Sequence, residues 1–156
     1  MQPLQRHPEY GPIVFGALWV GVLLVLSAVG GWRQLAEEYR AAVPFAGRRW
    51  WFRSAELRWA VHYGGCLTVG VNAEGLSLAV LFPFRIGHPP LFIPWRDVSA
   101  TERTRWLFFS VVELRFRRVP SVPVRLDRDL ARRIETAARS AWPTSASALE
   151  RPARIT

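Results

Sequence analysis

Residues 12–32 read PIVFGALWVGVLLVLSAVGGW, and no charged side chain interrupts them. At about 1.5 Å of rise per residue, a helix of this length extends roughly 31 Å, against about 30 Å for the hydrocarbon core of a bilayer. The run is apolar on every side, with Trp19 and Leu23 on no particular face, so it lacks the single apolar stripe of a helix on a soluble domain. The stretch therefore predicts a transmembrane helix over residues 12–32, preceded by an N-terminal segment over residues 1–11.

Two other interpretations of this run stay open. A cleaved secretory signal would use Arg6 as its positive start and Ala28-Val29-Gly30 as its small-residue cleavage site. Arginines follow the run, however, whereas a mature chain normally starts neutral or acidic. A buried helix of a soluble domain would need a larger core than a chain of 156 residues readily provides.

The charges that flank the run predict its orientation. Before it stands one arginine, Arg6; within about 20 residues after it stand Arg33, Arg40, Arg48, Arg49 and Arg53. Basic residues concentrate on the cytoplasmic side of a membrane span. The predicted location is therefore the inner (plasma) membrane, with a single pass and a cytoplasmic C-terminal domain.

The overall composition sets limits on partners and compartment. The 21 basic residues are all arginine and the formal net charge is +9; we interpret the absence of lysine first as coding bias. Such a charge suits nucleic acid or an anionic surface, and for an anchored chain anionic lipid is the nearer partner. A merely solvated arginine surface is the simpler alternative. Cys66 is the single cysteine, which precludes an intramolecular disulfide and fits a reducing compartment.

Residues 33–47 are predicted to form a helical juxtamembrane linker. The segment RQLAEEYRAA at 33–42 has Leu35, Tyr39 and Ala42 at helical spacing, and Pro44 would end it. We expect this helix to continue the transmembrane helix into the cytoplasm. Trp32, Arg33 and Tyr39 would then lie at the membrane interface, as amphipathic aromatic rings often do. The motif RRWWFR at 48–53 either lies there too or opens a strand, which we favour.

From residue 50 onward the periodicity is two, which is typical of strands with one buried face. Asn72-Ala73-Glu74-Gly75 reads as a hairpin turn between two such runs. Residues 58–65 leave strand, turn and loop all open. A conservative count gives seven strands, at about residues 50–58, 66–72, 75–83, 91–95, 98–106, 109–118 and 122–127, which predicts a small antiparallel barrel or sandwich.

A helix follows the last strand. Asp127 or Asp129 can cap its first turn, and Pro143 ends it. An apolar stripe marks its buried face, comprising Leu130, Ile134, Ala137, Ala138 and Ala141. The β domain with this helix spans residues 48–142. The tail, residues 143–156, is rich in Ser, Ala, Pro and Arg and is predicted to be disordered.

Seven strands followed by one helix is the element order of the pleckstrin-homology (PH) superfold. The segment PLFIPWRDV at 90–98 also resembles the apolar-Pro-Trp-x-Asp-apolar segment of bacterial single-span membrane proteins with a C-terminal PH-like domain. The resemblance implies an α+β fold and a membrane-attached binding or scaffolding module, not an enzyme. Eukaryotic members often bind phosphoinositides through the first hairpin. Arg58, His62 and Tyr63 fall near that place without its basic cluster, so we do not carry that ligand over.

The search for chemistry in the residues argues against catalysis and metal binding. His7, His62 and His88 are too dispersed for a metal site, and we expect His88 to be a hydrogen-bonded loop residue. Cys66 is four residues from His62, a spacing that pairs them only in a helix, and we expect it to be a small buried thiol. No phosphate-binding glycine loop is present in the sequence. We predict no enzyme activity and no cofactor.

The arginines of the last two strands and the C-terminal helix are the candidate binding surface. They are Arg115, Arg117, Arg125, Arg128, Arg132 and Arg133. Like charges on neighbouring strands repel one another unless something neutralises them, so this surface would face a partner protein or anionic headgroups. The alternative is local neutralisation by Glu113, Asp127 and Asp129. Nucleic-acid binding is disfavoured because the aromatic residues occupy alternating core positions rather than exposed ones.

These observations predict a membrane-anchored, non-enzymatic interaction or scaffolding module, bound to a partner protein in a membrane complex or to anionic lipid at the inner membrane face. The alternatives are an extracytoplasmic accessory protein and a membrane-anchored enzyme whose site the sequence does not reveal.

Overall fold

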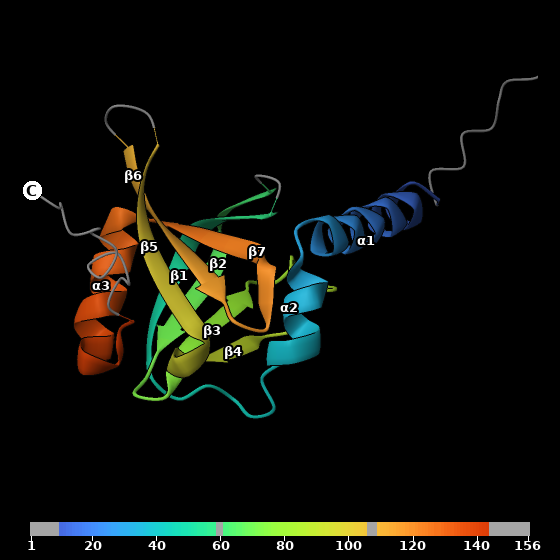
Figure 1. Cartoon of the computed structure of the whole chain (residues 1–156). Coiled ribbons are helices and arrows are strands. Elements are labelled where there is room, and N and C mark those ends of the chain that lie inside the picture. Colours follow the sequence, from blue (N-terminus) through green and yellow to red (C-terminus); the bar gives the residue numbers. More distant parts are fainter. Residues whose placement is uncertain (1–9, 59–60, 106–108, 144–156) are drawn as a thin grey trace, which may run out of the picture.

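A computed structural model describes residues 10–58, 61–105 and 109–143, so the predicted disordered tail and the start of the chain lie outside the described residues, apart from Tyr10, Gly11 and Pro143. The chain folds into an extended N-terminal helix followed by one antiparallel sheet flanked by two helices (Figure 1). The elements are α1 (Gly11–Val29), α2 (Trp32–Tyr39), β1 (Arg48–Leu57), β2 (Val61–Val71), β3 (Gly75–Val80), β4 (Leu91–Pro94), the 3-10 turn η3 (Trp95–Asp97), β5 (Val98–Arg105), β6 (Phe109–Phe116), β7 (Val119–Asp127), α3 (Arg128–Ala138) and the 3-10 turn η4 (Arg139–Ala141).

Helix α1 has the length and composition to cross a membrane, and it is the one helix among the described residues that does. Its apolar side chains stay uncovered: Ile13, Phe15 and Leu18 are 67%, 66% and 65% exposed. Near its C-terminal end it meets the rest of the protein, where Leu23 and Ser27 are buried. Most of the helix is therefore exposed along its length, and it packs against the β domain near its C-terminal end.

The prediction that residues 33–42 continue the membrane helix is wrong. Helix α1 ends at Val29, and Gly31 turns the chain with a left-handed φ of 81°. A Cβ at Gly31 would come within 2.6 Å of Val122 Cγ2, so only glycine fits both the backbone angle and the space. Helix α2 then starts at Trp32 and ends at Tyr39, and it packs on β4 and β7 as part of the domain core.

The seven strands form one sheet in the order β4-β3-β2-β1-β7-β6-β5, with antiparallel neighbours throughout. Strand β1 joins the two halves: its first part pairs with β2 and its last part, at Ala55 and Glu56, pairs with β7. Register shifts on either side of Arg53 bend it. The predicted α+β class, with an N-terminal apolar helix, seven antiparallel strands and a C-terminal helix, is confirmed at this level.

The boundaries of the first sheet half differ from the predicted ones. Strand β2 begins at Val61 and runs through Gly64 and Gly65, the region that the sequence left open. The alternation is lost there because glycines carry no side chain and Gly65 adopts a φ of 64°. Strand β3 ends at Val80, so residues 81–90 form a loop rather than the end of a strand.

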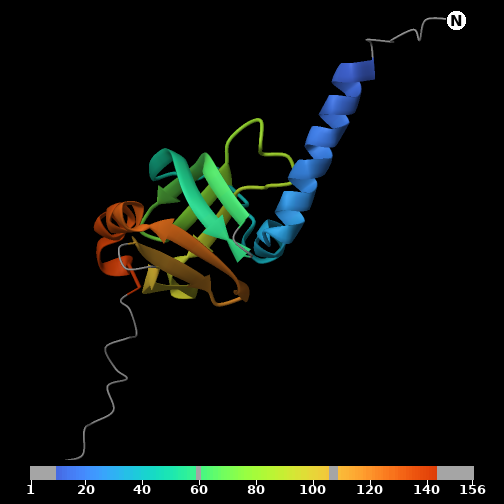
Figure 2. The same ribbon diagram turned by 90° about the horizontal axis from the view of Figure 1, so that it is seen from above.

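Helix α3 covers the sheet at the end opposite to α2 (Figure 1). Asp127, one of the two predicted caps, accepts a hydrogen bond from the Leu130 N–H at 2.7 Å. Leu130 and Ile134 enter the core formed by both sheet halves. Figure 2 shows that the loop between β3 and β4 lies alongside α1, whereas β5 and β6 lie on the far side of the domain.

The Pro-Trp-x-Asp segment has a structural role in this fold. The Trp95 indole donates to the Asn72 carbonyl at 2.9 Å, and the Trp95 N–H donates to the Glu74 carbonyl at 3.1 Å. The Asn72 side chain accepts from the N–H groups of Glu74 and Gly75, both at 2.9 Å. The predicted hairpin turn at 72–75 is thus fastened to the turn that leads from β4 into β5.

Candidate functional site: the arginine surface and the helix–loop junction

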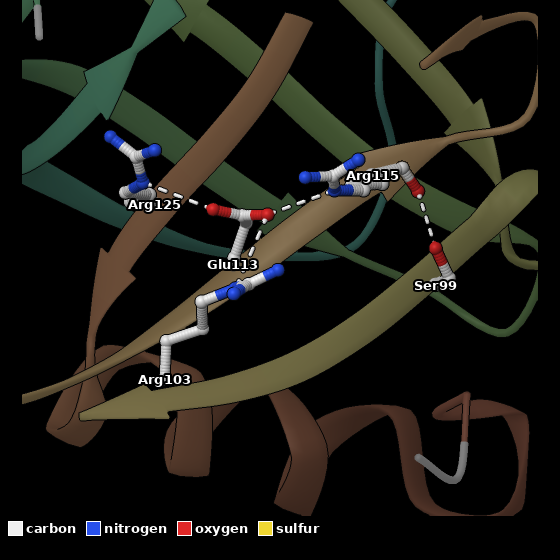
Figure 3. Close-up of polar contacts among 5 residues, drawn as sticks. All are labelled: Ser99, Arg103, Glu113, Arg115 and Arg125. Carbon is white, nitrogen blue, oxygen red and sulfur yellow. Dashed lines mark hydrogen bonds and ion pairs between the residues drawn. The ribbon is translucent and has the colours of Figure 1, made fainter. Parts of the chain in front are cut away.

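Glu113 is the centre of a charged cluster on β5, β6 and β7 (Figure 3). The register places Glu113 opposite Thr101 on β5 and Arg125 on β7, which brings the flanking arginines onto one face. Its carboxylate accepts hydrogen bonds from Arg115 Nε at 2.8 Å and Arg125 Nε at 3.1 Å, and Arg103 Nε lies 3.7 Å away. Burial alone would raise the pKa of Glu113, but these hydrogen bonds outweigh it and hold the pKa below its usual value.

This cluster keeps an excess of positive charge. Glu113 is buried, whereas the side chains of Arg103 and Arg115 are half exposed. Glu56 lies opposite Arg125 in the β1–β7 register, so three guanidinium groups stand among two carboxylates. The excess lies toward Arg103 and Arg115, whose outer atoms face solvent. We call these three arginines with Glu113 the Glu113 cluster.

A second pair of arginines lies around Asp97, at the end of the Pro-Trp-x-Asp segment. Arg117 Nε is 3.0 Å and Arg118 Nε is 3.2 Å from its buried carboxylate. Arg118 also lies 3.7 Å from Glu38 and over the ring of Tyr39, with 5.7 Å between the guanidinium carbon and the ring centroid. Two cations and two anions balance here, so Arg117 belongs to a structural ion-pair group and not to the Glu113 cluster.

The other predicted arginines lie elsewhere. Arg128 pairs with Glu102 at 3.2 Å, and Arg132 and Arg133 are exposed on α3, where both line a shallow hollow beside Trp50. The predicted arginines therefore have different carboxylate partners, and their role in binding a partner or lipid stays a prediction. Local neutralisation does occur. Glu113, one of the predicted carboxylates, provides part of it and Asp97 and Glu102 provide more, whereas Asp127 caps a helix.

Two of the three residues predicted at the membrane interface are enclosed by protein. Trp32 is fully buried and its indole donates to the Pro89 carbonyl at 2.9 Å. Tyr39 packs against Phe116, its hydroxyl accepts from the Arg118 N–H at 3.1 Å, and burial raises its pKa. The turn at Gly31 causes this change, because it directs α2 into the domain. Arg33 stays exposed, 3.7 Å from Glu37.

The junction between α1 and the β domain contains a buried polar network that the sequence did not indicate. The Ser27 hydroxyl donates to the Gly87 carbonyl at 2.6 Å. His88, which is buried, has Nδ1 at 2.9 Å from the Ile86 carbonyl and Nε2 at 2.9 Å from the Tyr63 hydroxyl. Because a carbonyl only accepts, Nδ1 carries the proton and Nε2 accepts from Tyr63.

Burial fixes the protonation states in this junction. It lowers the pKa of His88, which favours the neutral ring, and it raises the pKa of Tyr63, which stays a donor. The prediction that His88 is a hydrogen-bonded loop residue is confirmed. Cys66 is half-buried rather than fully buried, and burial raises the pKa of its thiol. The network holds the β3–β4 loop against α1, so its role is structural.

The segment that joins α2 to β1, residues 40–47, separates two hollows. One, of about 420 Å³, is lined by residues that include Arg49, Trp51, Phe82 and Arg85. The other, of about 580 Å³, lies between Tyr39, Phe45 and Phe92. Both have mainly apolar walls. Among residues 10–58, 61–105 and 109–143, no group of three His, Cys, Asp or Glu side chains is placed to hold a metal ion.

Comparison with protein-family models, curated proteins and solved structures gives no match. The PH-like resemblance therefore stays a prediction, and the site has to be interpreted from its own geometry. Within the described residues, that geometry includes a strand surface with excess positive charge, the Glu113 cluster, a pair of exposed arginines on α3, and an apolar region where the β3–β4 loop meets α1.

Proposed function

We propose that this chain is a membrane-anchored, non-enzymatic interaction module in which α1 crosses the bilayer and the β domain binds a partner protein at the cytoplasmic face. The observation that carries the proposal is the exposed apolar surface of α1. A helix with most of its large apolar side chains exposed is unfavourable in water, whereas a bilayer would cover it. Its backbone groups are paired within the helix, as lipid requires.

The junction supports an anchor that is retained rather than cleaved as a signal. Ser27 and Leu23, near the end of α1, are buried against the domain, and Ser27 is bonded to the β3–β4 loop. Cleavage near residues 28–30 would remove these contacts. The excess of arginine after α1 supports the cytoplasmic side.

The Glu113 cluster supports a protein partner more than lipid as the ligand of the arginines. The cluster lies on β5, β6 and β7. Strands β5 and β6 are on the side of the domain opposite to the β3–β4 loop, which contacts α1 (Figure 2). Its excess charge would attract an acidic surface and speed the encounter. An anionic membrane beside α1 would face the opposite side of the domain.

The anchor and its side are tested with the full chain in cells. Carbonate extraction should leave the protein in the membrane fraction. Alkaline phosphatase fused to the C terminus should be inactive, and a fluorescent protein at the same place should fluoresce. Extraction into the soluble fraction contradicts the anchor, and phosphatase activity places the domain outside the cytoplasm, which favours the extracytoplasmic alternative.

The partner surface is tested by site-specific photo-crosslinking in the same cells. A photoreactive residue at Ser99, an exposed position opposite Arg115 in the register, should give a discrete protein adduct. The same residue at Thr136, exposed on α3, is the control position. The double variant Arg103→Ala/Arg115→Ala should reduce the Ser99 adduct several-fold, and Arg132→Ala/Arg133→Ala, which removes the same charge elsewhere, should not. Equal effects of both double variants, or no adduct from Ser99, contradict the proposal.

A further inference from the structure

The β3–β4 loop, residues 81–90, is attached to α1 at three successive places. Phe84 lies 5.4 Å from Trp19 between ring centroids. Gly87 comes so close to the helix that a Cβ there would be 2.9 Å from Leu24 Cδ2. Its carbonyl accepts from Ser27. These contacts extend from Trp19 to Ser27, about 12 Å along the helix axis at 1.5 Å per residue.

The attachment ties the depth of the loop to the depth of the helix. Helix α1 has 19 residues and is about 28 Å long, so nearly all of it is needed to cross a hydrocarbon core of about 30 Å. Trp19 lies about 15 Å back from Val29 along the axis. When α1 spans the bilayer, the contacts of the loop with Trp19 and Leu24 lie inside the membrane boundary, so the loop has to be at that boundary or within it, even if the helix tilts.

The outward side of the loop suits lipid. Phe82 is 87% and Ile86 is 42% exposed. On β1, Phe52 is 75% exposed, and Trp51 shares the lining of the 420 Å³ hollow with Phe82. Large apolar side chains as exposed as Phe82 and Trp51 around one hollow are uncommon on a soluble surface and mark an interaction site. Arg49 and Arg85 border the same hollow, where their guanidinium groups would meet phosphates.

Part of the loop backbone is paired within the protein. The N–H of Leu81 donates to the Cys66 carbonyl at 2.8 Å, that of Phe84 to Leu81 at 2.8 Å and that of His88 to Arg85 at 2.9 Å. Pro83 has no N–H to satisfy. Irregular backbone is tolerated near hydrocarbon only where its polar groups are paired or covered.

We propose that the β3–β4 loop is a second membrane contact, in which Phe82 and Ile86, with Trp51 beside Phe82, enter the headgroup–acyl boundary while Arg49 and Arg85 bind lipid phosphates. The inference rests on the proposed function, because α1 must span the bilayer for the loop to be carried there. The bilayer contact would hold the domain at one angle to the membrane.

The test is the depth of a nitroxide spin label on the full chain, reconstituted in vesicles of phosphatidylcholine with phosphatidylglycerol. Labels are attached to single cysteines in a Cys66→Ser background. Phe82→Cys reports on the loop, and Ala73→Cys, in the turn at the other end of β3, is the matched control. Ile13→Cys, exposed on α1, reports on the anchor. Accessibility to oxygen and to a water-soluble nickel chelate is measured at each site.

The proposal expects oxygen to exceed the nickel chelate in accessibility at Phe82→Cys and Ile13→Cys, and the reverse at Ala73→Cys. A lipid-exposed label at Ile13→Cys with a water-exposed label at Phe82→Cys overturns the loop inference and leaves the anchor intact. Water-exposed labels at both sites overturn the anchor and the inference that rests on it. Vesicles of phosphatidylcholine alone separate the contributions: loss of the Phe82→Cys depth there assigns the contact to anionic headgroups, and retention assigns it to apolar insertion.

Discussion

Replacing Trp32 with alanine should destabilise the whole β domain, because this residue is a core residue rather than part of a linker. The Trp32 side chain is fully buried, packs against Tyr63 and His88 at ring distances of 5.7 and 5.4 Å, and donates to the Pro89 carbonyl. Truncation of a buried Trp to Ala costs about 3–5 kcal/mol. The loss of the indole N–H also leaves a carbonyl without its donor, which adds about 1 kcal/mol.

The expected change is large enough to measure in detergent. In a protein of this size, 1 kcal/mol corresponds to a shift in Tm of about 2–4 °C, so the loss of about 4–6 kcal/mol in Trp32→Ala should lower the Tm of the full chain by roughly 8–24 °C. Thermal unfolding is followed by near-ultraviolet circular dichroism in micelles. The matched control is Trp51→Ala, which removes a half-exposed indole and should change the unfolding free energy by no more than about 0.5 kcal/mol.

A linker residue gives a different result. If α2 only connected a membrane helix to the domain, Trp32→Ala would leave the Tm close to that of Trp51→Ala. Equal melting temperatures for the two variants would refute the assignment of α2 to the core. They would also weaken the junction on which the position of the β3–β4 loop depends.

The remaining predictions concern pH and the charged cluster. Glu113→Gln should lower the free energy of unfolding by about 1–3 kcal/mol, because buried Glu113 binds Arg115 and Arg125 through charge-assisted hydrogen bonds. The loss is limited because the partly exposed arginines can be hydrated by solvent in the variant. The pKa of Glu113 is lowered in the fold, so its contribution to the free energy of unfolding is complete above the unfolded pKa of about 4.3 and is lost as the pH falls below it. Urea unfolding at pH 3–7 should therefore show a smaller loss of stability in acid for the variant than for the original chain. An equal loss in both contradicts the pairing. The pKa of His88 is lowered as well, so its contribution to the free energy of unfolding is complete above the unfolded pKa of about 6.5 and is lost as the pH falls below it. In His88→Gln, the free energy of unfolding should therefore change less between pH 5 and 7 than in the original chain. Equal pH dependence in both would show that His88 does not take up a proton on unfolding.

The sequence was sufficient for elements that depend on local pattern. The apolar run, the alternation of Val112, Leu114 and Phe116, and the Asp127 cap each follow from neighbours in the chain, and the structure contains all of them. The two-residue period failed at Gly64 and Gly65 in β2, where glycine removes the side chains that define it, and at residues 81–83, where β3 has already ended at Val80.

The sequence was not sufficient for features that depend on long-range contacts. The direction of α2 depends on the fit between Gly31 and Val122, which are far apart in the chain. The arginines were correctly placed on neighbouring strands, but their carboxylate partners were not predictable: Asp97 reaches Arg117 and Arg118 across a strand connection. The contact of Ser27 with Gly87 has no signal in either segment.

The turn at Gly30–Gly31 decides how the two candidate surfaces relate to each other. A flexible linker after α1 would let the domain rotate freely beneath a membrane, and neither surface would then have a fixed direction. Instead, the chain passes directly from a buried Ser27 to a buried Trp32, and the intervening glycines pack against Tyr63 and Val122. With the domain attached in this way, the side that carries Phe82 is held beside α1, and the Glu113 cluster is directed away from it. A bilayer around α1 and an acidic partner on β5 and β6 can therefore be bound at the same time without competing for the same face.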